Sequence, residues 1–418
     1  MSRRVLMVAG EASGDALGAR LAAAMLRADP TLRLYGVGGD AMRAAGVDTI
    51  VDSAELSVMG FAELGREIGR VLSAFRMLRR ELLANSPDLF IPIDFPDFNL
   101  PLCRSAHKAR VPVFYYVSPQ VWAWRRGRID TIARTVTRML VLFPFEVEIY
   151  RSHGVDAHFV GHPLAEDVAA TRPREEVRAE LGVTGSRRLV ALLPGSRRRE
   201  VEAMLPPMVE AALALGPDVV AVIAEAPSLA PGLVAGVLAG NRGEPRAGEG
   251  RDPSAAGNRN RYQSPISMEG RDGSQGLAEN RYLSPFGAIA CRRGDTYNLL
   301  AASDAALVTS GTATLEGALV GCPMVVAYRM SAFSYALARR LVKVPFIAMP
   351  NLLLGRRVVP ELVQQEADAA HMAGEARLLL DDASERGRML ADFGEIRRLL
   401  ARPGAADRAA ALALELLS

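Results

Sequence analysis

The sequence has few cysteines, no paired metal-ligand motif and no long hydrophobic run. Its three cysteines, Cys103, Cys291 and Cys322, lie far apart without a CxxC pair. This usage predicts neither a disulfide framework nor a zinc site and fits a reducing cytosol. The five histidines include no HExxH pair, so no metal is predicted. No apolar run reaches about 18 residues, and the N-terminus lacks the apolar core of a signal peptide. We therefore expect a cytoplasmic protein whose membrane contacts are at most peripheral.

Length and charge narrow the class further. A chain of 418 residues, 50% of them hydrophobic, is long enough for two domains with substantial cores. Its formal net charge of +3 is too small for a strongly basic nucleic-acid-binding protein. We therefore predict a soluble globular protein that does not bind nucleic acid.

Short β-rich runs alternate with helical stretches, and this alternation occurs twice along the chain. Strands separated by amphipathic helices predict parallel sheets covered on both faces. We predict an α/β protein with two Rossmann-like domains facing a cleft, over residues 1–165 and 186–330. A charged linker joins them, and a helical region over 331–418 packs across both domains. Neither half contains GxGxxG, so no dinucleotide cofactor is predicted.

A polar segment over residues 241–285 interrupts the second domain. It is rich in Gly, Arg, Asn, Ser and Pro, and it repeats itself with an offset of twenty residues. EGRD at 249–252 recurs at 269–272, and NRYQSP at 260–265 recurs as NRYLSP at 280–285. Such a composition cannot bury a core, and two copies are too few for a solenoid. We expect a disordered insertion whose removal leaves activity unchanged; a functional Arg-rich tether is the alternative.

The second half contains a turn suited to phosphate. In LVALLPGSRRRE a strand, a Pro-Gly-Ser turn and a helix follow one another. The amides after Gly195, the Ser196 hydroxyl and the Arg197 guanidinium can hold phosphate oxygens at a helix N-terminus. The alternative is a tight turn followed by solvated arginines.

A second turn of this kind follows in the same predicted sheet. Ser310, Gly311 and Thr312 end a strand and open a helix, and Glu316 follows one helical turn later. There its carboxylate can accept hydrogen bonds from a ribose; an ordinary surface carboxylate is the alternative. Because both turns lie at carboxyl ends of strands, they converge on the crevice where α/β proteins bind ligands.

The first half contains a candidate general base in the stretch IDFPDFN. Asp94 ends a buried strand beside apolar phenylalanines, which can raise the pKa of its carboxyl group. Asp97 and Asn99 follow in a proline-containing loop. The alternative is that one of the aspartates caps the helix that begins near residue 100.

The turn GEASGDALG opens the first helix with Glu11, Ser13, Gly14 and Asp15. A glycine turn between a strand and a helix is typical of a phosphate site, but two carboxylates would repel a phosphate. We therefore expect this turn to contact sugar hydroxyls or to set the charge around Asp94.

Aromatic and basic residues gather in two further places. Trp122 lies beside Arg125 in YYVSPQVWAWRR, where the pair can stack on a ring or bind an anion; packing in the core is the alternative. Apolar residues alternate with arginines over 56–83 and again over 335–357. Such stretches can lie on an anionic bilayer, whereas the default is a helix packed on the core with solvated charges.

Taken in order, these motifs resemble the lipid-A-disaccharide synthase family. The resemblance rests on AGEASGD, VMGFAE with Met59, IDFPDFN, YYVSPQVWAWR, FPFE, GHPL, LLPGSRRRE, SDAALVTSGTATLE, CPMVVAYR and PNLLLGR. It extends from about residue 4 to the last helix and omits only the insertion.

The resemblance implies an inverting glycosyltransferase of the GT-B type that needs no metal or cofactor. The family joins UDP-2,3-diacylglucosamine to 2,3-diacylglucosamine 1-phosphate (lipid X), releasing UDP, at the cytosolic face of the inner membrane. Asp94 matches the essential aspartate of the IDxPDFN motif and Glu11 the acidic residue of the GExSGD motif, and the resemblance implies a catalytic role for both. Arg197 matches the arginine of LPGSR and Glu316 the glutamate of SGTAxLE, which the resemblance places on the donor side. On the acceptor side the resemblance implies Ser13, Gly14, Asp15, Met59, Asp97, Asn99, Trp122 and Arg125. It also favours a homodimer.

Two other classes remain open at this stage. A UDP-sugar 2-epimerase would use the same nucleotide turns without needing membrane-facing apolar patches. A peripheral membrane scaffold would need neither of the carboxylates in IDFPDFN. An assay with the two lipid-sugar substrates distinguishes the three classes.

Overall fold

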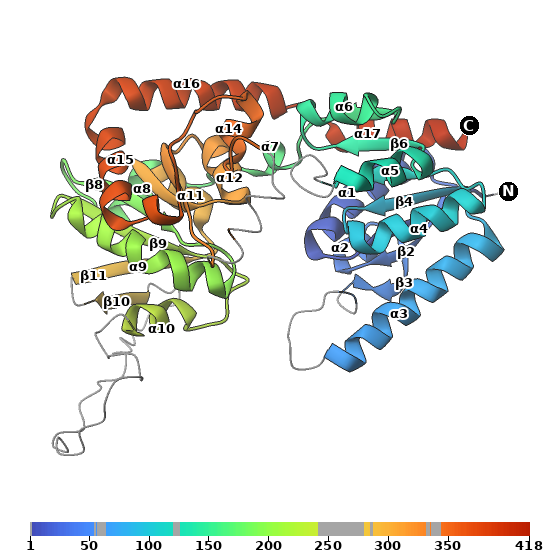
Figure 1. The fold of residues 1–418 in the computed structure, drawn as a ribbon, viewed down its shortest axis with the longest axis horizontal. Helices are drawn as coiled ribbons and strands as arrows, with labels where there is room; N and C mark the ends of the chain where they lie inside the picture. Colours follow the sequence, from blue (N-terminus) through green and yellow to red (C-terminus); the bar gives the residue numbers. More distant parts are fainter. Residues whose placement is uncertain are drawn as a thin grey trace, which may run out of the picture.

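The computed structural model describes residues 2–53, 56, 64–119, 126–240, 280–284, 287–331, 335 and 344–418. Two α/β halves lie side by side, the N-terminal half at the right of Figure 1 and the C-terminal half at the left. The chain crosses between the halves twice, first near residue 162 and again near residue 400.

The N-terminal half is built on a seven-stranded sheet in the order β3-β2-β1-β4-β5-β6-β7, and all its strand pairs are parallel. Apolar side chains cover both faces of this sheet, as expected when helices flank a parallel sheet. The strands are β1 Arg4–Ala9, β2 Arg33–Gly38, β3 Asp48–Asp52, β4 Leu89–Ile93, β5 Phe114–Tyr116, β6 Arg138–Val141 and β7 Ala157–Phe159. The helices are α1 Ala12–Ala28, α2 Asp40–Ala44, α3 Leu64–Arg80, α4 Pro96–Lys108, α5 Ile129–Thr135 and α6 Pro144–Arg151.

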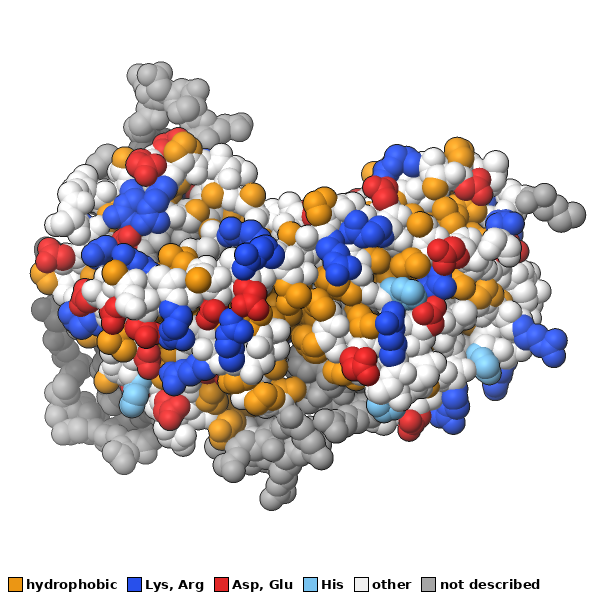
Figure 2. All heavy atoms as spheres, turned by 90° about the horizontal axis from the view of Figure 1, so that it is seen from above, with side chains coloured by type: hydrophobic (Ala, Val, Ile, Leu, Met, Phe, Trp, Pro, Cys, Tyr) orange, Lys and Arg blue, Asp and Glu red, His pale blue; other side chains and the backbone are white. Residues whose placement is uncertain are grey.

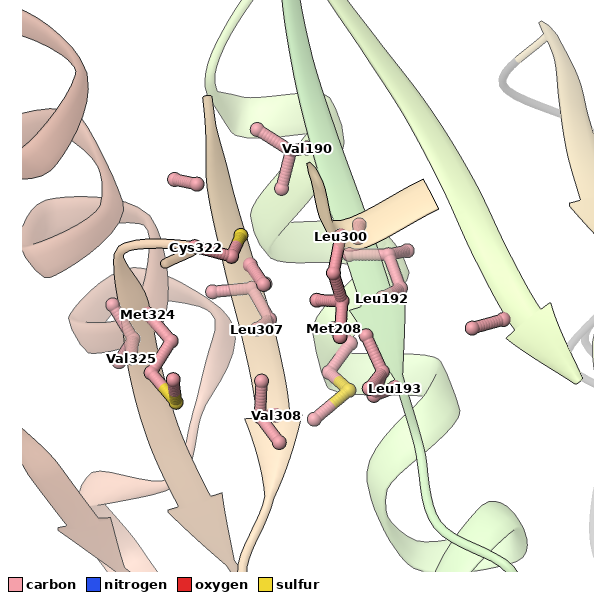
Figure 3. Close-up of a cluster of buried hydrophobic side chains, with 14 of the residues drawn as sticks. Val190, Leu192, Leu193, Met208, Leu300, Leu307, Val308, Cys322, Met324 and Val325 are labelled. Carbon is pink, nitrogen blue, oxygen red and sulfur yellow. The ribbon is translucent and has the colours of Figure 1, made fainter. Parts of the chain in front are cut away.

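The C-terminal half repeats this plan in the order β10-β11-β9-β8-β12-β13-β14, with only β10 antiparallel to its neighbour among these strands. Figure 3 shows its core, where side chains of β8, β12 and β13 interlock. The strands are β8 Arg188–Leu193, β9 Val219–Glu225, β10 Asn280–Ser284, β11 Gly287–Arg293, β12 Ala305–Thr309, β13 Met324–Tyr328 and β14 Glu361–Val363. The helices are α7 Leu164–Asp167, α8 Arg174–Glu180, α9 Arg198–Ala214, α10 Leu233–Gly240, α11 Thr296–Ala302, α12 Thr312–Val320, α14 Met349–Leu354, α15 Ala369–Asp381 and α16 Ala383–Leu400. The last helix, α17 Ala405–Leu414, belongs to the core of the N-terminal half.

The structure corrects the predicted end of the insertion. Residues 280–284, the second copy of the repeated NRYLS, form β10 and pair antiparallel with β11 at the sheet edge. The expectation that the whole of 241–285 is disordered is therefore wrong for these five residues; residues 241–279 lie outside the described part. A deletion that preserves the sheet must end before residue 280.

The predicted domain boundary at residue 330 is also wrong. Residues 361–363 form β14, which pairs with β13 and completes the second sheet. This strand is only three residues long and lies between two helical stretches, so the sequence indicated only helix beyond residue 330. The second core extends to Leu400, so α14, α15 and α16 belong to the C-terminal half.

After α16 the chain returns to the N-terminal half, where α17 packs against α1 (Figure 1). Arg27 of α1 and Asp407 of α17 form an ion pair at 2.6 Å. Where the chain crosses, the backbone N–H of His162 donates to the carbonyl of Leu400 at 3.2 Å. Seen from above, hydrophobic side chains gather between the halves and are flanked by Lys and Arg (Figure 2). The helices after residue 330 thus divide between the halves, with α14, α15 and α16 in the second core and α17 in the first.

In each sheet the strand order reverses beside the first strand of that half. The reversal lies between β1 and β4 in one sheet and between β8 and β12 in the other. Ligands of open α/β sheets bind outside the carboxyl ends of strands at such a switch point. The turns after these four strands contain most of the predicted site residues. No helix among the described residues has both the length and the hydropathy needed to cross a bilayer.

Candidate active site

Asp94 lies on a strained turn at the carboxyl end of β4. Asp94 and Phe95 have φ angles of +45° and +48°, so two consecutive non-glycine residues adopt the left-handed conformation. Each costs about 1–2 kcal/mol, and such strain persists only where the surroundings hold it. We call residues 94–95 the Asp94 elbow.

Hydrogen bonds from three directions hold the backbone of the elbow. The Asp94 N–H donates to the carbonyl of Tyr116 on β5 at 2.9 Å. The Asp94 carbonyl accepts from the Tyr115 hydroxyl and from the Asn99 side-chain amide, each at 2.8 Å. These three bonds use only backbone atoms of Asp94, so they leave its carboxylate oxygens out of the clamp.

The elbow packs tightly against the turn that follows β1. A Cβ at Gly10 would lie 2.3 Å from the Phe95 ring, so only glycine allows this approach. Phe95 also stacks on Phe98 with ring centroids 5.3 Å apart. This packing places Asp94 near Glu11, which is exposed and precedes the first residue of α1.

The surroundings of Asp94 make its carboxylate a better base. Burial raises the pKa of Asp94, and the negative charge of Glu11 raises this pKa further. A carboxylate whose pKa is raised towards neutrality is a more effective general base while it is still ionised. The geometry therefore suits removal of a proton from a hydroxyl by Asp94, with Glu11 as the neighbour that adjusts its basicity.

Asp15 stabilises the fold by binding the backbone at the start of α2. Its side chain is buried, and its two oxygens accept from the backbone N–H groups of Gly39, Ala41 and Met42 at 2.6, 3.0 and 3.1 Å. It thus caps the N-terminus of α2, and both of its carboxylate oxygens already accept hydrogen bonds from that helix. Gly14 is also buried, whereas Ser13 is exposed.

The other residues predicted on the acceptor side also include both buried and exposed side chains. Asn99 is fully buried, and its side-chain amide donates to the Asp94 carbonyl. Asp97 is exposed and forms an ion pair with Arg128. Met59, Trp122 and Arg125 lie outside the described residues.

In the C-terminal half, the turn after β8 holds a carboxylate of its own. Glu200 accepts from the backbone N–H groups of Ser196 and Arg197 at 3.1 and 3.3 Å and pairs with the Arg197 guanidinium at 3.2 Å. Gly195, at φ +118°, lies so close that a Cβ there would be 2.5 Å from the Glu200 Cβ. The amides that we expected to bind phosphate are therefore engaged by Glu200 in this structure.

The turn after β12 is differently arranged. Gly311 has a φ of +154° and precedes Thr312, the first residue of α12. The Ser310 hydroxyl donates to the carbonyl of Ile347 at 2.8 Å, which ties this turn to the segment before α14. No hydrogen bond from another side chain among the described residues engages the amides of Thr312 and Ala313. The N-terminus of α12 can therefore receive an anion directly.

A cavity of about 570 Å³ opens beside α12. Its lining residues come from the carboxyl-end turns of β9 and β11, from α11 and α12, and from the linker between the halves. They are Ala169, Thr171, Ala226, Pro227, Gly294, Asp295, Thr296, Tyr297, Asn298 and Glu316.

Two carboxylates line this cavity, those of Asp295 and Glu316; Asp295 is bound by Asn298 and Arg292. The Tyr297 hydroxyl donates to Oε1 of Glu316 at 3.0 Å, and burial raises the pKa of Glu316. Asn298 fixes the opposite wall, because its Oδ1 accepts from the backbone of Thr171 at 2.8 Å and of Arg172 at 3.1 Å. The cavity thus offers hydrogen-bond acceptors for hydroxyl groups between apolar walls, as a nucleoside requires.

Sequence reasoning missed the residues that support the site. Tyr297 and Asn298 fall in a short helical stretch outside the quoted motifs, and Tyr115 begins YYVSPQVWAWR, in which the sequence drew attention only to Trp122 and Arg125. Their positions one strand or one helix away from Asp94 and Glu316 appear only when the sheets are assembled. Among the described residues, no group of three or more His, Cys, Asp or Glu side chains is arranged to hold a metal ion.

Comparison with known proteins identifies the family. The sequence matches the model of the lipid-A-disaccharide synthetase family over residues 5–225 and 287–414. The chain belongs to this family. The lipid-A-disaccharide synthase of Geobacter sulfurreducens is 40% identical over 419 residues, covering 100% of this chain and 98% of that protein. The chain is therefore a glycosyltransferase of lipid A synthesis.

Two solved structures show the fold. The putative UDP-N-acetylglucosamine 2-epimerase of Listeria monocytogenes has a TM-score of 0.57 at 14% identity, covering 99% of this chain and 95% of that one. The glycotransferase of kitacinnamycin has a TM-score of 0.56 at 14% identity, with 100% of both chains covered. At this identity the likeness shows the fold alone, which is that of the GT-B glycosyltransferases.

Proposed function

We propose that the chain transfers 2,3-diacylglucosamine from UDP to 2,3-diacylglucosamine 1-phosphate with inversion at the anomeric carbon. The products are a β-1,6-linked lipid A disaccharide 1-phosphate and UDP. The observation that carries this proposal is the Asp94 elbow, which presents a half-buried carboxylate of raised pKa at the switch point of the first sheet.

The reaction needs a base on the acceptor. Asp94 removes the proton of the acceptor 6-hydroxyl as that oxygen attacks the anomeric carbon of the donor. The new carbon–oxygen bond forms while the bond from that carbon to the UDP phosphate oxygen breaks, so the electron pair leaves with UDP. A single displacement of this kind inverts the anomeric centre.

The second half accommodates the donor. The cavity beside α12 takes the nucleoside, with the ribose hydroxyls donating to Glu316. The diphosphate lies at the N-terminus of α12, where the helix dipole and the amides of Thr312 and Ala313 stabilise its growing negative charge. Arg197, whose guanidinium is largely exposed, completes the anion site from the turn after β8.

Incubation with UDP-2,3-diacylglucosamine and 2,3-diacylglucosamine 1-phosphate tests the reaction. We expect disaccharide and UDP in equal amounts, with a β linkage seen in the anomeric NMR coupling. A product of altered sugar stereochemistry without acceptor would support a 2-epimerase instead. Absence of any reaction with either substrate set would contradict an enzymatic role.

We further propose that the exposed face of α3 docks on an anionic membrane surface. Leu72 and Met77 on α3, and Leu83 just after it, are 44%, 39% and 45% exposed. Leu72, Arg76, Arg79 and Leu83 follow an i, i+4, i+7, i+11 spacing that gathers them on one side of the helix, and both arginines are exposed. An exposed apolar stripe with arginines beside it suits a bilayer with negative head groups.

Sedimentation with vesicles tests this docking. The chain should bind phosphatidylglycerol-containing vesicles more strongly than purely zwitterionic ones, and Leu72→Gln with Leu83→Gln should weaken that binding. The matched control is Leu390→Gln, which changes a leucine of similar exposure, 39%, on α16 of the other half. Equal loss in both variants, or no preference for anionic lipid, would contradict the assignment.

A further inference from the structure

We propose that Tyr115 and Asn99 are positioning residues that hold the Asp94 elbow in the geometry needed for proton removal. This inference rests on the proposed function, because it assigns Asp94 as the base. Neither residue faces solvent, since both side chains are fully buried. They act on the reaction through the backbone of Asp94.

The left-handed conformation explains why side chains must hold this carbonyl. In a regular parallel strand, each carbonyl accepts from a backbone N–H of the neighbouring strand. The pairing of β4 with β5 ends at Ile93, and at Asp94 the positive φ turns the chain away from the ladder. A carbonyl turned away at a buried strand end needs other donors. The Tyr115 hydroxyl and the Asn99 amide provide them at 2.8 Å each.

Asn99 shows that position 99 requires a donor. Its Nδ2 faces three backbone carbonyls, those of Val8, Ile93 and Asp94, at 3.4, 3.4 and 2.8 Å. Its Oδ1 is buried without a hydrogen-bond partner among the described residues. An orphaned buried acceptor is unfavourable, so the arrangement is retained for the donor side of the amide. That amide ties together the ends of β1 and β4, the two strands that flank the switch point.

Tyr115 approaches the same carbonyl from β5. Its ring is part of the buried core on one face of the sheet, so the hydroxyl position is fixed by packing. Two rigid donors on one carbonyl, one from α4 and one from β5, restrict rotation of the strained peptide. The direction of the Asp94 carboxylate follows from that backbone, because its Cβ is fixed by the same φ and ψ.

Tyr115→Phe tests the inference, because it removes the hydroxyl and keeps the ring. We expect kcat to fall about tenfold or more, since small misplacements of a catalytic group cost up to about 100-fold. The KM values of donor and acceptor should stay near those of the wild type. Asn99→Asp, which replaces the donor by an acceptor of the same shape, should lower kcat further.

The matched control is Tyr35→Phe. Tyr35 is buried in the same core cluster, and its hydroxyl bonds to Glu81 at 2.8 Å, outside the elbow contacts. The Tyr35→Phe variant also loses a tyrosine hydroxyl that donates a hydrogen bond in this core. Its thermal stability should therefore fall to a similar degree, while its kcat stays unchanged. Equal kcat losses in the two variants would show a general effect of destabilisation and overturn the inference.

An Asp94→Asn background separates this inference from the proposed function. If Tyr115 acts through Asp94, Tyr115→Phe should cause no further loss in that background, because residues that act as a unit are not additive. Substantial turnover by Asp94→Asn itself would contradict the assignment of the base. An inactive Asp94→Asn together with a fully active Tyr115→Phe would overturn the positioning role alone.

Discussion

The two halves have the same strand order around their switch points but opposite chemistry in the turns there. β1 and β4 correspond to β8 and β12, since each pair consists of the two central strands that flank the reversal. After β4 the chain presents Asp94 from two left-handed non-glycine residues, whereas after β12 it uses Gly311 and presents backbone amides. One topology therefore presents a carboxylate in the first half, which we propose as the base, and backbone amides in the second, which we propose as the anion site.

The turns after β1 and β8 each contain a carboxylate, and the two carboxylates bind different partners. After β1, Asp15 reaches to a neighbouring helix and caps α2. After β8, Glu200 turns back and binds the amides of its own turn. An acid close to a helix N-terminus is thus no evidence of function by itself, because helix capping alone can account for it.

The largest effect should come from removing the base of the first half. Asp94→Asn should lower kcat by about 100- to 10,000-fold, the range over which general bases contribute. UDP affinity should be unchanged, because the nucleoside cavity lies in the other half. Single-turnover assays with calorimetric UDP binding measure both; a joint loss of the two would indicate that the elbow also shapes the donor site.

Removing the Glu316 carboxylate of the nucleoside cavity should affect binding. Glu316→Ala should weaken UDP about 10- to 100-fold, since a hydrogen bond to a charged group contributes about 1.5–3 kcal/mol. The loss should be much smaller for 2′,3′-dideoxy-UDP, which lacks the ribose hydroxyls. Glu375→Ala, a half-exposed carboxylate on α15, is the control. A loss of equal size for both nucleotides would contradict ribose recognition.

The variant Asp15→Ala tests whether the carboxylate that follows β1 stabilises the fold rather than binding the acceptor. Asp15→Ala should lower the free energy of unfolding by about 1–3 kcal/mol, because buried backbone donors of α2 lose their acceptor. The KM of the acceptor should remain that of the wild type once folded protein is assayed. Chemical denaturation and initial rates measure the two quantities; a raised acceptor KM without loss of stability would restore the sugar contact.

In the wild-type protein, Glu200 should weaken donor binding, because its carboxylate occupies the amides of Ser196 and Arg197 beside the proposed anion site. Glu200→Gln keeps an acceptor for the turn but removes the charge, so UDP should bind about two- to fivefold more tightly. The gain should shrink as salt rises. Glu202→Gln on the same helix removes an equal charge away from the turn and should have no effect. Weaker binding by Glu200→Gln would show that the cap itself is needed.

Glu11→Gln should have the smallest effect, a shift along the pH axis. The charge of Glu11 raises the pKa of Asp94, so its removal lowers that pKa. Asp94 must be ionised to act as a base, and the acid limb of kcat/KM against pH should therefore move to lower pH. A pH profile of initial rates measures this. An unchanged acid limb would mean that burial alone sets the basicity of Asp94.

Much of the fold could be predicted because its signals are local. Alternating strands and helices indicate two parallel sheets, and Asp94 and Glu316 follow apolar strands by short fixed distances. β14 and β10 could not be predicted, since each is a short edge strand that gains its structure from a neighbouring strand. Tertiary pairing decides such strands, and local composition does not.

The partners of the site residues were beyond sequence reasoning for the same reason. Nothing near Asp15 in the chain indicates that its acceptor oxygens serve residues 39–42, more than twenty positions away. Tyr115 likewise meets Asp94 only because β4 and β5 are neighbours. Chemistry-bearing residues stand out by type, whereas the residues that orient them are ordinary apolar or amide side chains.

The return of α17 to the first half has a consequence for synthesis. The alanines Ala405, Ala409, Ala410 and Ala413 fill the same core as α1, so the core of the N-terminal half is incomplete until α17 has been made. The second core is complete at Leu400, whereas the first core still needs residues that follow it in the chain. In a chain truncated after residue 400, the C-terminal half should still fold, whereas the apolar face of α1 should be exposed. The N-terminal half should then be the part that aggregates.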